Sequence, residues 1–353
     1  MMEALYTLVR AGLWGKVEDL SHFPITTDRW AQLYKEAHRQ AIGGIVFQGI
    51  MLLPEELHPP HSILFRWVAE ADRIERNNKL MNETLNRLLT LFASHGLAPM
   101  VLKGQAVATM YETPLLRECG DIDLYFDEKE QQKAITLLHE LHIPYETHAD
   151  GSVCYTWNGI EVEHHPTLID IQSPSKRRYI KSLMKELHTN DSYIKEIPCL
   201  SPTLNILLLN THILKHCIGV GIGLRQLCDM ARAYHYYKES LSHDTIREIY
   251  RQAGIETWSI LLHAFMVKHL GLAQELQPYT NLEEIDTHPL QEIISRGGNF
   301  GKHALSSQKP VTTWQHKRQT LATFWRNRHF SWRYARNEAL WTIIQLTKGT
   351  ITH

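Results

Sequence analysis

The stretch Gly120-Asp121-Ile122-Asp123-Leu124 is the most informative part of this sequence. On a β-strand, residues two apart point to the same face, so Asp121 and Asp123 would present two carboxylates side by side. Ile122 and Leu124 would then face the core. Two adjacent like charges repel each other unless a cation lies between them, and Mg²⁺ prefers carboxylate oxygens. The pattern therefore indicates a metal site, and the alternative is an ordinary solvated strand face.

A second acidic strand is predicted at residues 160–164, where Glu161 and Glu163 share a face. Asn158-Gly159 lies between this run and an earlier alternating run, which is the strongest short-range hairpin signal in a sequence. We therefore expect one of the two glutamates to complete a trio of carboxylates with the first acidic strand.

A phosphate-binding turn is predicted upstream of both acidic strands. Residues 99–102 (PMVL) form a short apolar run that ends at Lys103-Gly104. Glycine permits close backbone approach to a phosphate and lysine supplies charge, although a lysine at a strand end is often only a surface residue.

A basic residue, Arg117, lies between this turn and the first acidic strand. It is a candidate phosphate contact, and the alternative is a salt bridge to Glu112 or Glu118. The elements follow the order that nucleotidyl transfer requires: a strand, a Lys-Gly turn, a helix, a basic residue and two acidic strands. This order would place a phosphate-binding turn beside a two-metal site.

Together these motifs resemble the polymerase-beta-type nucleotidyltransferase superfamily, and in particular a bacterial family of uncharacterised nucleotidyltransferases. Its members carry an L-K-G turn, an R-x-x-G-D-I-D-L strand and a later acidic strand that ends in His. The matching residues lie within roughly residues 98–168: Leu102-Lys103-Gly104, Tyr111, Pro114, Arg117, Gly120-Asp121-Ile122-Asp123-Leu124 and Glu163-His164-His165. The helical remainder is similar more loosely, through Lys215-His216 and the segment from Gly223 to Asp229.

The resemblance implies catalytic and metal-ligating roles for Asp121, Asp123 and Glu163. In the superfamily the third carboxylate, here Glu163 rather than Glu161, helps to deprotonate the attacking hydroxyl. The implied reaction is the Mg²⁺-dependent transfer of NMP from an NTP, with ATP expected as donor, two metal ions and release of pyrophosphate. The acceptor stays open, because small molecules, proteins and RNA all serve relatives of this superfamily.

The resemblance also implies nucleotide binding by Lys103, Gly104, Gln105 and Arg117. Gly104 matches the glycine of the phosphate-binding turn, but the usual Gly-Ser pair is replaced by Lys103-Gly104-Gln105. The serine hydroxyl is therefore absent, and Lys103 could replace it as a point charge. An alternative function follows from this departure, which is a catalytically weak or inactive nucleotide-binding or regulatory module of the same fold.

The expected fold class is α+β, with a small mixed-sheet nucleotidyltransferase core between helical regions. We expect an N-terminal helical region at 1–97, the core at 98–200 and a C-terminal helical domain at 201–353. Apolar spacing and capping signals predict helices at residues 30–48, 62–95, 106–111, 128–141, 202–214, 224–237, 245–253 (with Asp244 as N-cap), 258–270 and around 313–346. Residues 277–308 are rich in turn formers and predict a poorly packed connection.

Two further pairs lie on predicted helices. His212 and His216 are four residues apart, which suits a metal pair, but without a third ligand nearby they are better interpreted as core or cleft histidines. Arg225 and Asp229 are also four apart and predict an ion pair, or else lie in an acceptor pocket. His165 shares the face of Glu163, and its role is open.

The C-terminal stretch interleaves basic and aromatic side chains. They are Lys317, Arg318, Arg326, Arg328, Arg333 and Arg336 among Trp314, Phe324, Trp325, Phe330, Trp332 and Tyr334. Such a segment can bind RNA or an anionic membrane, and an RNA-binding adaptor is a third functional hypothesis. The favoured interpretation is an amphipathic helix that packs its aromatic residues on the domain.

The overall composition limits the remaining possibilities. The 353 residues carry 37 Lys and Arg against 38 Asp and Glu, which argues against nucleic-acid binding by bulk charge. Five cysteines without paired spacing indicate reduced thiols. With no signal peptide and no transmembrane segment predicted from the sequence, we expect a cytoplasmic protein of unknown oligomeric state.

Overall fold

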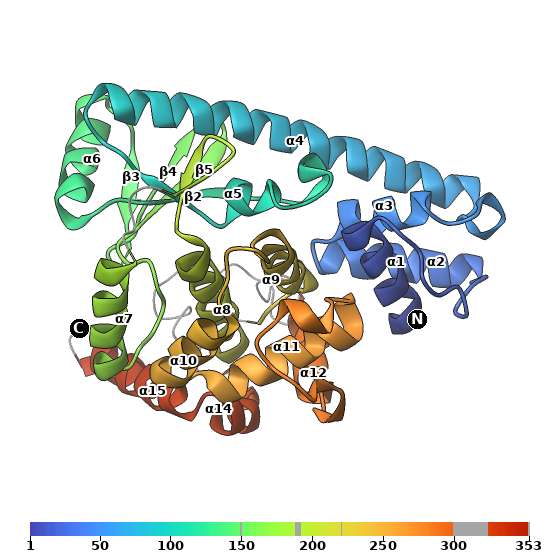
Figure 1. Ribbon diagram of the computed structural model, residues 1–353. Helices are drawn as coiled ribbons and strands as arrows, with labels where there is room; N and C mark the ends of the chain where they lie inside the picture. Colours follow the sequence, from blue (N-terminus) through green and yellow to red (C-terminus); the bar gives the residue numbers. More distant parts are fainter. Residues whose placement is uncertain (149, 188–191, 220, 299–323, 352–353) are drawn as a thin grey trace.

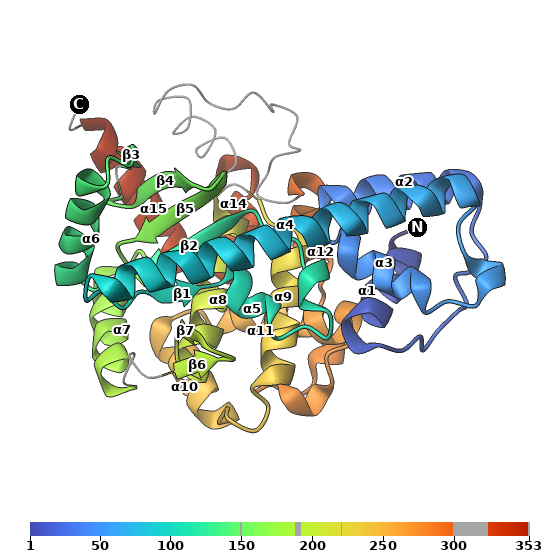
Figure 2. The same cartoon turned by 90° about the horizontal axis from the view of Figure 1, so that it is seen from above.

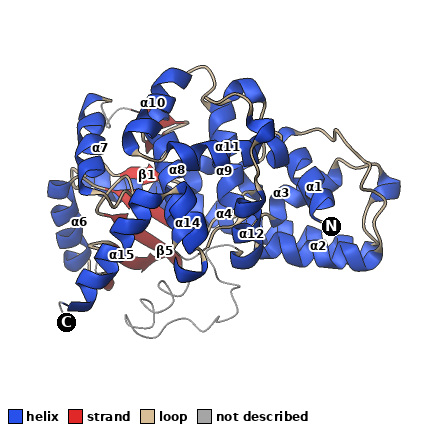
Figure 3. Ribbon diagram, turned by 90° about the horizontal axis from the view of Figure 1, so that it is seen from below, coloured by secondary structure: helices blue, strands red, loops and turns tan. Residues whose placement is uncertain are grey.

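The computed structural model describes residues 1–148, 150–187, 192–219, 221–298 and 324–351. Its centre is a five-stranded mixed sheet in the order β1-β2-β5-β4-β3, surrounded by helices (Figure 3). The strands are β1 Met100–Leu102, β2 Asp121–Tyr125, β3 Tyr145–Thr147, β4 Val153–Trp157 and β5 Ile160–His165. The architecture confirms the expected class, a small mixed-sheet nucleotidyltransferase core flanked by helices.

The two acidic strands are direct neighbours in this sheet. β2 and β5 pair in parallel, with Asp121 opposite Glu161 and Asp123 opposite Glu163. A parallel pair needs a crossover, and the chain supplies one through α6 (Glu128–Glu140), β3 and β4. Asp127 caps α6, because its carboxylate accepts hydrogen bonds from the backbone N–H groups of Lys129 and Glu130.

The predicted hairpin is present between β4 and β5. Trp157 pairs with Ile160, and the two turn residues have positive φ, 50° at Asn158 and 78° at Gly159. Two central residues with positive φ are typical of a type I′ turn, whose twist matches that of antiparallel strands. The turn therefore fixes which residues of β5 face the site.

The N-terminal helices are α1 Met2–Trp14, α2 Thr27–Arg39, α3 Gly43–Met51 and α4 His61–Ser94. The single helix predicted over residues 30–48 is wrong, because the chain turns at Ala41, where φ is 53°, and α3 starts a new direction. The long helix α4 matches its prediction, and Gly96 follows it with a left-handed φ of 69°. In Figures 1 and 2, α4 runs from the α1–α3 cluster across the sheet, so it links both parts.

Close packing holds α3 against the segment that precedes β2. This segment includes the short helix η2 (Pro114–Leu116). A Cβ added to Gly44 would lie 2.0 Å from the carbonyl oxygen of Leu116. Glycine is therefore required at this position because any side chain would separate α3 from the residues next to Arg117.

The remaining α-helices follow β1 along the chain. They are α5 Gly104–Ala108, α7 Pro174–Glu186, α8 Pro202–Ile218, α9 Leu224–Tyr236, α10 His243–Ala253, α11 Glu256–Leu270, α12 His288–Gly297, α14 Arg328–Tyr334 and α15 Arg336–Ile351. A second small hairpin, β6 Ser192–Ile194 and β7 Ile197–Cys199, precedes α8. Neither α7 nor this hairpin was expected from the sequence.

Two local predictions fail in this region. Ser242, not Asp244, is the N-cap of α10, because its hydroxyl accepts the backbone N–H of Thr245. Residues 277–298 are also well packed rather than loose, since Tyr279, Leu290 and Ile294 are buried. Residues 299–308 lie outside the described part of the chain.

The C-terminal aromatic residues are divided between the core and the surface. Phe324, Phe330 and Tyr334 are buried, as the packing hypothesis predicts, whereas Trp325 and Trp332 are 64% and 50% exposed. Trp314, Lys317 and Arg318 lie outside the described residues. Among the described helices, none is both long enough and apolar enough to cross a membrane.

Candidate active site

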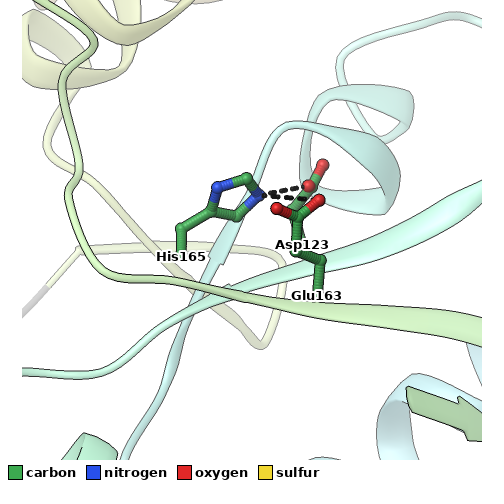
Figure 4. Close-up of side chains that lie close together, drawn as sticks. All are labelled: Asp123, Glu163 and His165. Carbon is green, nitrogen blue, oxygen red and sulfur yellow. Dashed lines mark hydrogen bonds and ion pairs between the residues drawn. The ribbon is translucent and has the colours of Figure 1, made fainter. Parts of the chain in front are cut away.

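Three side chains converge where β2 and β5 lie side by side. Asp123 comes from β2, and Glu163 and His165 come from β5 (Figure 4). His165 Nε2 lies 2.6 Å from Asp123 Oδ1 and 3.7 Å from Glu163 Oε2. Within the described residues this is the group whose ligand atoms all lie within 4.8 Å of one another, which is close enough to hold one metal ion.

The parallel register decides which glutamate belongs to this group. Because Asp123 is opposite Glu163, their side chains leave the sheet on the same face at the same level. Glu161 is opposite Asp121 instead, and its side chain is exposed. The structure thus brings Glu163 to Asp123, as the sequence predicts, and adds His165, whose role the sequence left open.

Asp121 is not part of this group of three close ligand atoms. The neighbouring charge of Asp123 raises the pKa of the Asp121 carboxyl, and burial raises it further. This is the response expected of two carboxylates that share a site. The two aspartates therefore interact electrostatically, as the D-x-D pattern predicts, although only Asp123 belongs to the group of three.

Lys103 supplies a positive charge to the same site. Its Nζ lies 3.3 Å from Asp123 Oδ1, and its side chain is largely buried. Burial lowers the pKa of Lys103, but the carboxylates of Asp123, Asp121 and others outweigh burial and raise it. The lysine therefore keeps its ammonium form beside the acidic strands.

The carboxyl of Asp123 responds in the opposite direction. Burial alone would raise its pKa, but the Lys103 ammonium and the hydrogen bond from His165 outweigh burial and lower the pKa well below its usual range. Asp123 is therefore ionised at neutral pH, which is the form that binds cations.

The Lys-Gly turn has an unusual backbone between β1 and α5. Lys103 has φ 50° and ψ −135°, which is a rare conformation for a residue with a side chain. Gly104 follows with φ 38°, and a Cβ there would make only ordinary contacts with Cys119 Sγ and Asp121 O, at 3.4 Å and 3.5 Å. The backbone angle, more than space, requires glycine at this position.

Gln105, a predicted nucleotide contact, belongs to a buried structural network. Its Nε2 donates a hydrogen bond to Asn78 Oδ1 of α4, and only 4% of the residue is exposed. Asn78 Nδ2 in turn donates to the carbonyl oxygens of Leu115 and Arg117, at 2.7 Å and 2.8 Å. The Gln105 side chain thus anchors the turn to α4.

Arg117, another predicted nucleotide contact, forms a buried ion pair with α9. Its Nε and Nη2 donate to the two carboxylate oxygens of Asp229, at 2.9 Å and 2.6 Å. Tyr111 donates a third hydrogen bond to the same carboxylate, at 2.8 Å. Arg117 is 3% exposed, so its guanidinium ties the segment that precedes β2 to helix α9.

The alternative partners expected from the sequence are engaged elsewhere. Glu112 pairs with Arg232, and Glu118 accepts the backbone N–H of Gly43. Asp229, predicted to pair with Arg225, pairs with Arg117. Arg225 itself donates to the carbonyl oxygen of Glu118, at 3.0 Å.

The histidine pair of α8 lies close enough to the site to feel its charges. The rings of His212 and His216 lie 4.4 Å apart in an edge-to-face arrangement. Burial lowers the pKa of His216 to about 3, with the charges of Lys215 and Lys103 acting in the same direction. His212 responds to burial and to Lys103 in the same way. Half-buried, neutral imidazoles match the interpretation of the pair as core or cleft histidines.

Comparison with known proteins agrees with this geometry. The family described as uncharacterised nucleotidyltransferase matches residues 26–271, which is more than half of the chain. The chain belongs to this family. No curated protein and no solved structure matches it.

Family membership gives the acidic strands a chemical context. The matched region, residues 26–271, covers α2 to α11, so it includes the helices on both sides of the sheet as well as the site. In a nucleotidyltransferase, carboxylates on adjacent strands hold divalent metal and a basic group meets phosphate. The sequence predicts acidic strands and a basic residue suited to these roles, but not that His165 and Lys103 contact the same oxygen of Asp123.

Proposed function

We propose that this protein is an Mg²⁺-dependent nucleotidyltransferase that moves NMP from an NTP, with ATP as the expected donor, to an acceptor hydroxyl or phosphate. Pyrophosphate is the second product. The observation that carries the proposal is the parallel register of β2 and β5, which sets Asp123 beside Glu163 within a chain of this family.

The donor set suits a hard divalent ion. Carboxylate oxygens of Asp121, Asp123 and Glu163 would hold two Mg²⁺ ions, and His165 offers a further nitrogen ligand at the edge of the group. When bound, the metal lowers the charge barrier at the α-phosphate. Lys103 and the backbone at Gly104 would bind the triphosphate.

Glu163 is better placed than Asp123 to accept the acceptor's proton. Its side chain is 28% exposed, against 7% for Asp123, so an incoming hydroxyl can reach it. Asp123 is occupied by His165 and Lys103 and is suited to binding a cation instead. Glu163 and Asp123 would thus have separate roles in the proposed reaction.

A second candidate function is a nucleotide-binding or regulatory module with little or no turnover. Two of the four predicted nucleotide contacts, Gln105 and Arg117, are committed to buried structural bonds. Fewer groups then remain to stabilise a transition state than the sequence suggested. This candidate keeps the metal and the nucleotide but not the acceptor chemistry.

Calorimetry tests the shared part of both candidates. ATP should bind the wild-type protein more tightly with Mg²⁺ than without it, and a double Asp121→Ala, Asp123→Ala variant should lose this dependence. Equal binding by both proteins would refute the metal site. Pyrophosphate release, measured over small-molecule, protein and RNA acceptors, then separates an enzyme from a binding module.

A further inference from the structure

Two basic groups meet at one carboxylate oxygen in this site. His165 Nε2 lies 2.6 Å and Lys103 Nζ lies 3.3 Å from the same atom, Asp123 Oδ1. Asp123 is 5% exposed, so few other directions of approach to this oxygen are open. A divalent ion that binds Asp123 Oδ1 must share this oxygen with the Lys103 ammonium or displace it, and an ion bound at Oδ2 of the same carboxylate would still lie close to the ammonium charge.

The backbone of the chain places Lys103 next to Asp123. It lies between β1 and α5 in a positive-φ conformation, directly opposite β2, because Leu102 pairs with Asp123 across the antiparallel strands. Because the lysine side chain begins next to Asp123, it loses little conformational freedom when it reaches the carboxylate. The lysine is therefore a tethered cation with a high local concentration at the acidic site.

We propose that the Lys103 ammonium competes with divalent metal for Asp123, and that a bound triphosphate relieves the competition by giving the lysine a new anionic partner. The inference rests on the proposed function and adds a regulation of the same site. Metal and nucleotide would then bind with positive coupling through a residue of the chain, beyond their direct contact with each other.

The charges of the site explain why the competition matters. A lysine ammonium and a divalent ion at one oxygen repel each other, and their repulsion is strong where water is excluded. Moving the ammonium a short distance onto phosphate oxygens removes this repulsion. By thermodynamic reciprocity, metal must then also raise the affinity for nucleotide by the same factor.

Binding of Mn²⁺ to the full chain measures this coupling without turnover. Free Mn²⁺ is followed by electron paramagnetic resonance, with and without a non-hydrolysable ATP analogue. Mn²⁺ bound directly to the analogue is measured separately and subtracted. For the wild type we expect the analogue to raise Mn²⁺ affinity by about tenfold, within the usual range for coupled sites.

The decisive variant is Lys103→Met, which keeps the length of the side chain and removes its charge. We expect it to bind Mn²⁺ alone about tenfold more tightly than the wild type, with an analogue effect reduced to about twofold. Lys103→Arg keeps a charge and should retain the coupling. Lys79→Met removes the same charge from an exposed lysine of α4 that pairs with Glu75 at 2.7 Å, and it should behave as the wild type.

The outcomes separate this inference from the proposed function. If Lys103→Met binds Mn²⁺ no more tightly than the wild type, or keeps the full analogue effect, the competition is refuted while the metal site stands. If the wild type binds neither Mn²⁺ nor analogue, both proposals fail. Should Lys103→Met not fold, absence of coupling in the wild type and in Lys103→Arg would refute the inference by itself.

Discussion

Arg117 and Asp229 form a buried, two-point ion pair between the segment that precedes β2 and helix α9, with Nη2 and Oδ2 2.6 Å apart. Both side chains are 4% exposed, and Tyr111 adds a hydrogen bond to the same carboxylate. The pair joins the acidic strand to the helical domain that faces it. These contacts indicate a structural role for Arg117, which is to hold the segment before β2 against helix α9.

Removal of either partner should therefore destabilise the fold more than it weakens nucleotide binding. Asp229→Ala leaves the Arg117 charge buried and unpaired, and we expect a loss of about 3–5 kcal/mol in the free energy of unfolding, measured by urea denaturation. Asp72→Ala breaks the exposed pair with Arg76 and should cost at most about 1 kcal/mol. A stable Arg117→Ala variant with weakened ATP binding would restore the phosphate-contact hypothesis.

The register of β2 and β5 predicts different outcomes at two glutamates of one strand. Glu163→Gln should reduce pyrophosphate release by at least about 100-fold, because Glu163 is the proposed proton acceptor. Glu161→Gln, two residues earlier and exposed, should retain activity within about threefold of the wild type. Equal losses in both variants, with unchanged folding by circular dichroism, would contradict the assignment of Glu163.

Two glycines provide a matched test of packing. Gly44→Ala places a Cβ 2.0 Å from Leu116 O and should lower the free energy of unfolding by about 3 kcal/mol, the upper end for an overpacked core. Gly120→Ala has no atom within 4 Å of the new Cβ and should fold with nearly unchanged stability. Thermal or urea unfolding checks both, and a strongly destabilised Gly120→Ala variant would contradict the arrangement of the turn before β2.

A buried histidine on α11, His263, should make stability depend on pH. Burial lowers the pKa of His263 to about 4, against the opposing effect of its bond to the Ser259 carbonyl oxygen. Between about pH 6.5 and pH 4 the unfolded chain binds a proton that the folded chain does not bind. Stability must therefore fall as the pH falls through this window, with a contribution of up to about 1.4 kcal/mol per pH unit.

Urea denaturation of the wild type and His263→Phe at several pH values measures this contribution. The variant should show a smaller loss of stability between pH 6.5 and pH 4 than the wild type, whereas above pH 7 the difference between the two proteins should not change with pH. Parallel curves across the whole range would show that His263 protonates equally in the folded and unfolded chain. Another buried histidine, His164, whose pKa burial lowers to about 3, adds to the slope in both proteins.

Much of the sheet could be predicted from the sequence because its signals are local. Alternation in β2 and β5, the Asn158-Gly159 turn and the Gly96 stop are each decided by a few adjacent residues. The break at Ala41 was missed because apolar residues continue through it, so the spacing gives no sign of the turn. Helices α7 and α12 were missed because each has few apolar residues, and burial against distant elements stabilises them.

The sequence by itself determined the chemistry available to this protein, which is three carboxylates, a lysine at a glycine turn and membership in a nucleotidyltransferase family. Tertiary structure alone decided which of these groups meet. Lys103, Asp123 and His165 come together because β1, β2 and β5 are neighbours in the sheet. Arg117 and Gln105 instead bond to Asp229 and Asn78, which lie 112 and 27 residues away in the chain, because buried polar groups must be paired. Such pairings depend on the packing of whole helices, which local sequence patterns do not encode.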